Sequence, residues 1–206
     1  MPVSQSYSKS FRDLISDKPR LQELLQGSLM FTEPWSKEKA WQEWESQRRF
    51  IAQAINQDGS FLDYGCANAF FLKCLKEWSS CKLDVYGIDV DENALKKARE
   101  LFPSAENHFT SQEDISNNPE YPREFNTIYW NVWDDYNFED GQEKNLLKSL
   151  LKATRKGGRL ILGFYDTKEK NLKTIEQLKG LGYTLSGILE NPSGGQEVVV
   201  WFDKAA

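Results

Sequence analysis

A short turn between a predicted strand and a predicted helix carries the residue types of a nucleotide-binding site. It lies within residues 61–72, FLDYGCANAFFL. An apolar pair that suits the end of a buried strand comes first, Gly65 lies among small residues, and an apolar run that suits a helix begins at Phe70. A sharp strand-to-helix turn brings backbone N–H groups and the positive end of the helix close to a ligand. The stretch therefore predicts a binding site of that kind.

Two alanines stand where such turns often have further glycines, at Ala67 and Ala69. Their small side chains leave room for a ligand. Alanine disfavours a positive φ, however, and would cost about 1 kcal/mol wherever the backbone requires one. With a negative φ it would cost nothing. Cys66, between them, is expected to be a small buried residue rather than a nucleophile.

An acidic residue, Asp89, ends the next predicted strand, LDVYGID. A carboxylate at this place can accept hydrogen bonds from both hydroxyls of a ribose, as acidic residues do in dinucleotide-binding folds. Its alternative role is to cap the helix that follows. Asp91 suits that cap better, so Asp89 is predicted to face the ligand.

The elements that would position these residues alternate between strand and helix. Strands separated by helices form a mostly parallel sheet covered on both faces, and two strands joined by a short glycine-containing turn run antiparallel. We therefore predict an α/β sheet whose last strands form an antiparallel hairpin. Residues 1–57 are expected to form a helical extension, with a long helix from Ser36, and residues 58–206 the α/β domain. Strands are predicted at 61–64, 83–89, 107–111, 125–130, 159–165, 183–189 and 197–202, and helices at 68–78, 91–102, 142–155 and 168–180.

Composition excludes several other classes of function. The net charge is −5 without a basic run, so nucleic acid is not an expected partner. No stretch approaches the ~20 apolar residues that span a bilayer, and the first residues lack the apolar core of a secretory signal. The three cysteines include no CxxC pair, which argues against a disulfide framework or a zinc site and favours the cytoplasm. The single histidine, His108, lies in a predicted strand without an evident Ser or Cys partner, so a hydrolase triad is not supported.

Four features in order resemble the class I S-adenosylmethionine-dependent methyltransferases, over about residues 50–202. They are the turn at 63–69, the strand end Gly-Ile-Asp at 87–89, Glu-Asp-Ile at 113–115, and Gly-Gly at 157–158 before a strand, a helix and a hairpin. The resemblance implies a Rossmann-like sheet of seven strands with the last one antiparallel. It also implies S-adenosylmethionine as cofactor and S-adenosylhomocysteine as product.

The resemblance assigns roles around the cofactor. Val90 and Ile115 are expected on opposite faces of the adenine, and Asp114 near its amino group. A solvated loop carboxylate stays an alternative for Asp114, and Glu113 is the neighbour with which it could be confused. The full predicted cofactor set is Asp63, Gly65, Cys66, Ala67, Ala69, Asp89, Val90, Asp114, Ile115 and Asn131.

The methyl acceptor is expected beside the loop that follows the fourth strand, because ligands of open α/β sheets lie beyond the carboxyl ends of the strands. Trp133 and Tyr136 are predicted to contact the acceptor, and aromatic faces beside carboxylates suit a cationic amine. Asp134 or Asp135 is the candidate base where the nucleophile must lose a proton. An acidic surface loop with packed aromatics is the other interpretation. Trp41 joins the acceptor site by the resemblance, since related enzymes often use an N-terminal extension as a lid.

These observations predict direct, in-line methyl transfer to a small-molecule acceptor. The loop is not the Asn/Asp-Pro-Pro-aromatic sequence of members that methylate nucleic-acid bases or glutamine. A nicotinamide-dependent oxidoreductase would need glycine at Phe70. A non-catalytic binding or scaffold protein that retains the fold is the remaining alternative, supported by the two alanines of the turn. The acceptor atom and the oligomeric state stay open.

Overall fold

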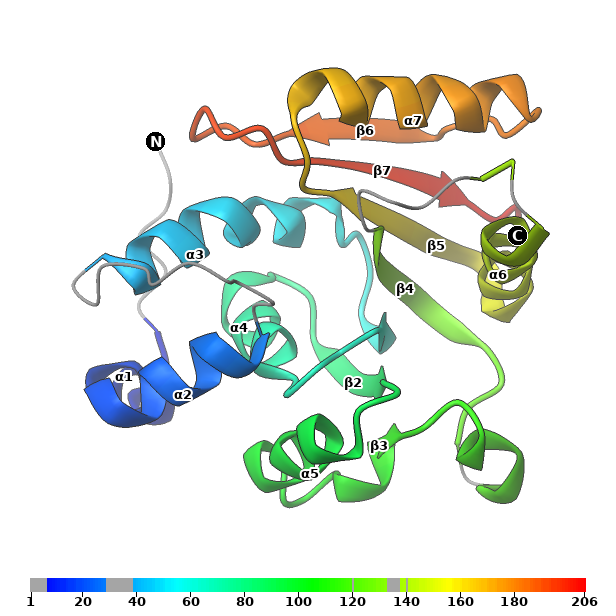
Figure 1. The fold of residues 1–206 in the computed structure, drawn as a ribbon. Coiled ribbons are helices and arrows are strands. Elements are labelled where there is room, and N and C mark those ends of the chain that lie inside the picture. Colours follow the sequence, from blue (N-terminus) through cyan, green and yellow to red (C-terminus); the bar gives the residue numbers. More distant parts are fainter. Residues whose placement is uncertain (1–6, 29–38, 120, 133–137, 140) are drawn as a thin grey trace.

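The computed structural model describes residues 7–28, 39–119, 121–132, 138–139 and 141–206. Its centre is a seven-stranded sheet of order β3-β2-β1-β4-β5-β7-β6 (Figure 1). The strands are β1 Gly59–Tyr64, β2 Leu83–Ile88, β3 Phe109–Thr110, β4 Phe125–Val132, β5 Thr154–Phe164, β6 Gly187–Glu190 and β7 Val198–Asp203. The helices are α1 Lys9–Ser16, α2 Lys18–Ser28, α3 Ala40–Arg48, α4 Phe70–Trp78, α5 Glu92–Leu101, α6 Gly141–Ala153 and α7 Lys168–Gly180, with 3₁₀ helices η1 Arg49–Ala54, η2 Glu106–His108 and η3 Asp114–Asn117.

The pairing of the strands confirms the predicted fold class. Strands β1 to β5 pair in parallel, whereas β7 runs antiparallel both to β5 and to β6. Strand β7 therefore lies inside the sheet although it is the last strand in the sequence. The carboxyl ends of β1, β2 and β4 meet at one edge, which is where the residues predicted to bind a ligand are found.

Successive residues of a strand face opposite sides of the sheet, and the two sides have separate apolar clusters. Phe61, Tyr129 and Val199 pack on the side of α1 to α5. Leu62, Ile128 and Val200 pack on the side of α6 and α7. The parallel strands are thus buried on both faces, which explains why apolar residues occupy successive positions in them, as at 61–62, 128–130 and 160–162.

The N-terminal helices share the core of the α/β body. Trp44 of α3 is fully buried, with its ring centroid 5.0 Å from that of Phe70 and 5.7 Å from that of Trp78, both in α4. Phe11 of α1 is also fully buried in the same cluster. We call α1, α2, α3 and η1 together the N-terminal segment. None of the helices in the described part of the chain is both long and apolar enough to cross a bilayer.

Some element boundaries differ from those predicted. Strand β5 starts at Thr154, inside the predicted helix, because Thr154 pairs with Phe125 of β4. On the other side Gly157 N–H donates to Lys204 O and Lys204 N–H donates to Gly158 O, which extends the sheet. His108 belongs to η2 and precedes a strand of two residues. The long helix predicted from Ser36 is described only from Ala40 and changes to a 3₁₀ helix at Arg49, Ser36 itself lying outside the described residues.

Candidate functional site

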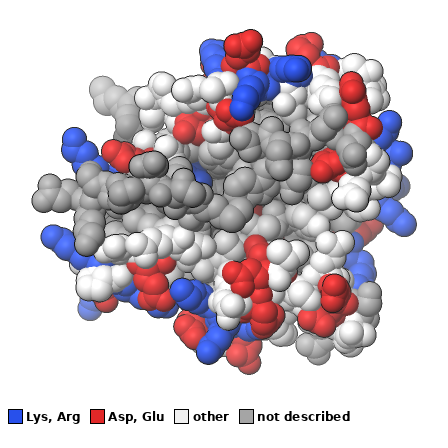
Figure 2. Space-filling view, in the orientation of Figure 1, with Lys and Arg blue, Asp and Glu red and all other residues white. Residues whose placement is uncertain are grey.

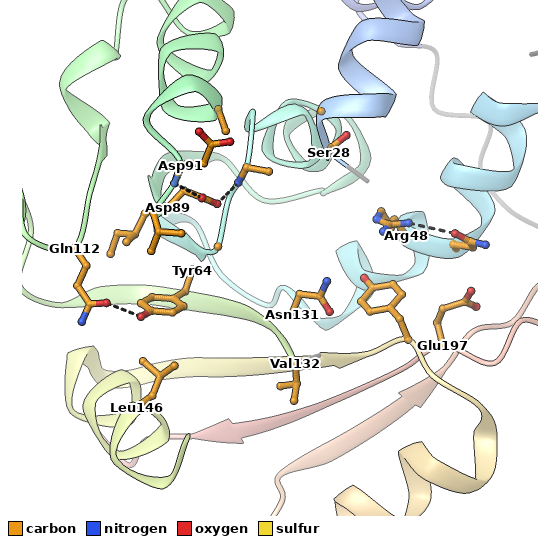
Figure 3. Close-up of a pocket in the computed structure, with 18 of the residues that line it drawn as sticks. Ser28, Arg48, Tyr64, Asp89, Asp91, Gln112, Asn131, Val132, Leu146 and Glu197 are labelled. Carbon is orange, nitrogen blue, oxygen red and sulfur yellow. Dashed lines mark hydrogen bonds between the residues drawn. The ribbon is translucent and has the colours of Figure 1, made fainter. Parts of the chain in front are cut away.

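A cavity of about 710 Å³ opens at the carboxyl edge of the sheet (Figure 3). The ends of β1, β2 and β4 form its floor, and residues of α2, α3 and the starts of α5 and β7 complete its wall. Tyr64 and Gln112 lie at one end of the view, Arg48 and Glu197 at the other, and Asn131 between them.

The turn after β1 adopts a left-handed backbone at three positions. The φ angles are +83° at Gly65, +48° at Ala67 and +58° at Ala69. The N–H groups of Gly65 and Cys66 both donate to Ile88 O, at 2.8 and 2.9 Å, which fixes the turn on the end of β2. The alanines therefore occupy the conformation that glycine favours, at a cost of about 1 kcal/mol each. The loop keeps the shape of a glycine-rich turn without its glycines.

The carboxylate of Asp89 joins this turn to the start of α5. Its Oδ2 accepts from Ala67 N–H at 2.7 Å, and its Oδ1 accepts from Asp91 N–H at 2.9 Å. Each carboxylate oxygen keeps a further lone pair, and Asp89 lines the cavity, so it can still accept from a ligand. Asp91 caps α5 by accepting from Asn93 N–H at 2.9 Å, as predicted.

An exposed apolar side chain stands beside this carboxylate. Val90 is 92% exposed, whereas most of the large apolar side chains in the described part of the chain are covered. It lines the cavity next to Asp89 and Ala94. An apolar surface of this kind, adjacent to a hydrogen-bonding carboxylate, suits the flat face of a base attached to a ribose.

Beneath the turn, Asp63 is 3% exposed at the end of β1. Burial raises the pKa of its carboxyl to about 8, the nearby Asp89 charge adds to the rise, and the Arg48 guanidinium opposes it. Burial likewise raises the pKa of the Cys66 thiol. A buried thiol of raised pKa is a poor nucleophile, which agrees with the packing role predicted for Cys66.

The other end of the cavity is polar and aromatic. The guanidinium carbon of Arg48 lies 4.9 Å from the ring centroid of Tyr165 and 5.2 Å from that of Trp44. The Tyr165 hydroxyl lies 2.8 Å from the hydroxyl of the buried Tyr129. A Cβ at Gly163 would lie 2.3 Å from Tyr129 Oη, so glycine at that position makes room for the pair of hydroxyls.

The predicted site residues separate into four groups. Five of the predicted cofactor residues line the cavity: Gly65, Ala67, Asp89, Val90 and Asn131. Asp63, Cys66 and Ala69 are buried below the turn. Trp133, Asp134, Asp135 and Tyr136 lie outside the described residues.

Three further predicted residues are described but do not line the cavity. Asp114 is exposed in η3 and accepts from Ser111 Oγ at 2.6 Å, with Ile115 next to it, while Gln112 is the residue of this segment that reaches the cavity. Trp41 packs on Trp44, with ring centroids 5.9 Å apart.

Several lining residues were not predicted from the sequence. Tyr165 and Asp166 follow β5 directly, and Glu197 immediately precedes the antiparallel β7, so all three lie at the carboxyl edge. The rule that places ligands at that edge could have identified them. Arg48 had a weaker signal, a cation one helical turn after the buried Trp44.

A family model described as a methyltransferase domain matches residues 55–204 of the chain. No curated protein matches the chain.

Solved structures resemble the chain at low sequence identity. The N-methyltransferase NodS from Bradyrhizobium japonicum in complex with S-adenosylhomocysteine is 17% identical, with a TM-score of 0.59 over 89% of this chain and 98% of that chain. A TehB-like SAM-dependent methyltransferase from Corynebacterium glutamicum is 20% identical, with a TM-score of 0.54 over 81% and 97%. A ribosomal protein L11 methylase from Lactobacillus delbrueckii subsp. bulgaricus is 12% identical, with a TM-score of 0.52 over 79% of each chain. At these identities the likeness is one of fold.

Proposed function

The chain belongs to the methyltransferase-domain family, and from that premise we propose that it transfers the methyl group of its cofactor directly to a small-molecule acceptor. The enzyme is an S-adenosylmethionine-dependent methyltransferase. The acceptor class is supported by one observation above the others, the cavity of about 710 Å³. Its volume falls within the range of about 300–1,000 Å³ that is usual for ligand pockets.

The residues of the cavity fit S-adenosylmethionine. At Gly65 no atom lies within 4 Å of an added Cβ, so the backbone of the turn is open to a close approach. Asp89 has lone pairs available for ribose hydroxyls, and the exposed Val90 offers an apolar face to the adenine. We place the cofactor along these three residues, with Ala67 and Asn131 beside it. Asp63, Cys66 and Ala69 then support the turn from below.

The cofactor, when bound, supplies a methyl group that is already activated by the positive charge of the sulfonium. The protein must then hold a nucleophile in line with that methyl group, which is chiefly a matter of position. Glu197 lies at the Arg48 end of the cavity, with Asn131 in the middle, and Tyr165 contacts Arg48; we assign the acceptor to these polar groups. Asp134 and Asp135 remain the proposed bases for an acceptor that must lose a proton, with Trp133, Tyr136 and Trp41 as proposed acceptor contacts.

Charge favours a neutral or cationic acceptor. Of the described residues that line the cavity, Asp89, Asp91, Asp166 and Glu197 carry carboxylates and Arg48 carries the positive charge. On the molecular face seen in Figure 2, acidic and basic side chains are mixed, without the continuous basic stripe that binds a phosphate backbone. Both features support an amine or a phenol, rather than a nucleic acid, as the methyl acceptor. The three free thiols, Cys66, Cys74 and Cys81, support a reducing compartment, and we propose the cytoplasm.

The experiment is calorimetric titration with S-adenosylmethionine and S-adenosylhomocysteine, followed by a screen of amines, phenols and small protein substrates for methyl transfer. We expect micromolar binding of both nucleosides and turnover of a small acceptor. Methylation confined to a protein or RNA acceptor would overturn the proposed acceptor class while leaving the cofactor site in place.

A further inference from the structure

One cationic side chain of the cavity has no anionic partner among the residues that the structure describes. Arg48 lines the cavity, and among the described residues no carboxylate oxygen lies within 4.0 Å of its guanidinium. Its Nη1 donates instead to the neutral amide oxygen of Gln47, at 3.3 Å. Its neighbour Arg49, by contrast, pairs with Glu45 at 2.7 Å. A partly buried charge without a counter-ion is unfavourable unless a ligand supplies one.

The carboxylates near Arg48 are occupied elsewhere. Glu197 accepts from Asn191 Nδ2 at 2.7 Å, and Asp166 pairs with Lys170 at 2.7 Å. Asp63 is close enough for Arg48 to lower its pKa, but burial dominates and raises that pKa to about 8, so the carboxyl is largely protonated at neutral pH. The described part of the cavity wall thus leaves the charge of Arg48 for a ligand.

Two aromatic rings fix the guanidinium. It lies 5.2 Å from the ring centroid of Trp44 and 4.9 Å from that of Tyr165, distances at which cations are attracted to ring faces. Trp44 is fully buried, and Tyr165 is tied to Tyr129 by their hydroxyls at 2.8 Å. A guanidinium has five N–H donors, and Gln47 takes one from Nη1, so the remaining donors can match the two oxygens of a carboxylate.

We propose that Arg48 binds a carboxylate of a ligand in this cavity, either that of the amino-acid end of the cofactor or one carried by the acceptor. The inference rests on the proposed place of the cofactor and does not depend on the size of the acceptor. Arg48 ends α3, so the N-terminal segment would contribute directly to ligand binding rather than only cover the site.

Two ligands that differ in the amino-acid end test the first source. S-adenosylhomocysteine carries the carboxylate, and 5′-methylthioadenosine lacks the whole amino-acid end. Calorimetry with Arg48→Gln is expected to show 10- to 100-fold weaker binding of S-adenosylhomocysteine and unchanged binding of 5′-methylthioadenosine, the usual effect of losing a charged hydrogen bond. Arg48→Lys should restore only part of the affinity, because lysine lacks the planar fork.

A second arm tests the acceptor. Wild type saturated with S-adenosylhomocysteine is titrated with 4-(aminomethyl)benzoate and with its primary amide. Preference for the acid that disappears in Arg48→Gln, with nucleoside binding unchanged, would assign the carboxylate to the acceptor. The matched control is Arg49→Gln, which removes the same charge one residue away, outside the cavity lining. It should alter neither the discrimination between the two nucleosides nor that between acid and amide.

Two results would overturn the inference. One is equal weakening of both nucleosides by Arg48→Gln, which a merely structural role predicts. The other is an unchanged affinity for S-adenosylhomocysteine together with no preference for the acid in the wild type. Failure of the small-molecule proposal is a different result, since nucleoside binding requires no acceptor.

Discussion

Ala67 and Ala69 have a left-handed backbone that glycine would adopt without strain. The turn keeps this shape because its amides are held from outside: Gly65 and Cys66 donate to Ile88 O, and Ala67 donates to Asp89. The sequence predicted the position of the turn and both possible outcomes for the alanines. It could not decide between them, since φ at each alanine depends on hydrogen bonds to a strand more than twenty residues away.

Replacing one of these alanines by glycine should stabilise the protein. Ala67→Gly removes left-handed strain of roughly 1–2 kcal/mol but adds unfolded-state freedom of roughly 0.4–1 kcal/mol, so we expect a net gain of about 0.5–1 kcal/mol. Urea denaturation measures it. Ala94→Gly, within α5, is the control and should destabilise by about 1 kcal/mol. A loss of stability in Ala67→Gly would mean that the turn has a different backbone.

The buried Asp63 predicts a pH-dependent stability. The pKa of its carboxyl rises from an ordinary value of 3.8 to about 8 in the folded protein. Between these values the folded state holds a proton that the unfolded state has released, so stability falls as pH rises, by at most about 1.4 kcal/mol per unit. Below about pH 4 both states are protonated and the penalty is absent.

Asp63→Asn isolates this contribution, because the amide has the same shape and does not titrate. We expect the stability of the variant relative to the wild type to increase by roughly 1–4 kcal/mol between pH 5 and pH 8. Urea denaturation at several pH values gives the difference directly. A constant difference across this interval would show that Asp63 is ionised in the folded protein.

Asp89 is the side chain on which the cofactor site depends most. Asp89→Ala should weaken the binding of S-adenosylhomocysteine by about 1–3 kcal/mol, which is the loss expected for hydrogen bonds to a charged acceptor. Since Asp89 also holds Ala67 and Asp91 amides, thermal denaturation must show that the variant is folded. Thr167→Ala, which removes the N-cap of α7 outside the cavity lining, is the control and should lower stability with little effect on affinity. Equal affinities of Asp89→Ala and wild type would remove Asp89 from the site.

Helix α2 and the cofactor turn are joined by one fully buried side chain. Asn68 Nδ2 donates to Leu24 O at 2.8 Å, and its Oδ1 accepts from Phe70 N–H at 3.1 Å. Gly27, also in α2, lies so close that an added Cβ would be 2.6 Å from Asn68 Nδ2. A movement of α2 must therefore disturb the turn, so we expect the N-terminal segment to influence binding of the cofactor.

Gly27→Ala tests this connection. The added methyl group must displace Asn68, so we expect about 1–3 kcal/mol of destabilisation and a several-fold loss of affinity for S-adenosylhomocysteine. The control is Gly180→Ala at the end of α7, where an added Cβ meets no atom within 4 Å. It should be neutral or slightly stabilising and leave affinity unchanged. Unchanged affinity in a destabilised Gly27→Ala would separate α2 from the cofactor turn.

At the level of elements, the alternation of strands and helices predicted most of the fold. The hairpin at 183–202 predicted the antiparallel end because a short connection permits no other direction. The start of β5 was not predicted. Its residues Arg155 to Gly158 are typical of a helix end, and they become part of a strand only through partners far away in the sequence, β4 on one side and Lys204 on the other.

The whole cavity is a product of tertiary structure. Arg48, Gln112, Tyr165 and Glu197 come from four separate regions of the chain. None belongs to a local motif, so the motif-based prediction found the cofactor turn and missed most of the other end of the cavity. The part of the site that is built from neighbouring residues was therefore predicted, and the part that is assembled from residues far apart in the sequence was missed.

The shared core predicts that the N-terminal segment and the α/β body unfold together. Tryptophan fluorescence, which includes the contribution of Trp44 at their junction, and far-UV circular dichroism should give one coincident denaturation curve. Trp44→Ala should shift both curves by about 3–5 kcal/mol. A separate early fluorescence transition would show that the N-terminal segment detaches by itself. The control is Trp201→Phe, at a partly buried position of β7, which removes a tryptophan from the fluorescence signal without changing a residue of the N-terminal segment.

The position of β7 inside the sheet has a consequence for synthesis on the ribosome. Strand β5 stays an open edge, and β6 has no strand to pair with, until Val198–Asp203 arrives. All parallel strands have by then left the exit tunnel, so the nascent chain carries an unpaired apolar edge that could recruit other chains. The sheet therefore cannot be completed before β7 has been made, and termination before Val198 would yield an aggregation-prone product rather than a smaller enzyme.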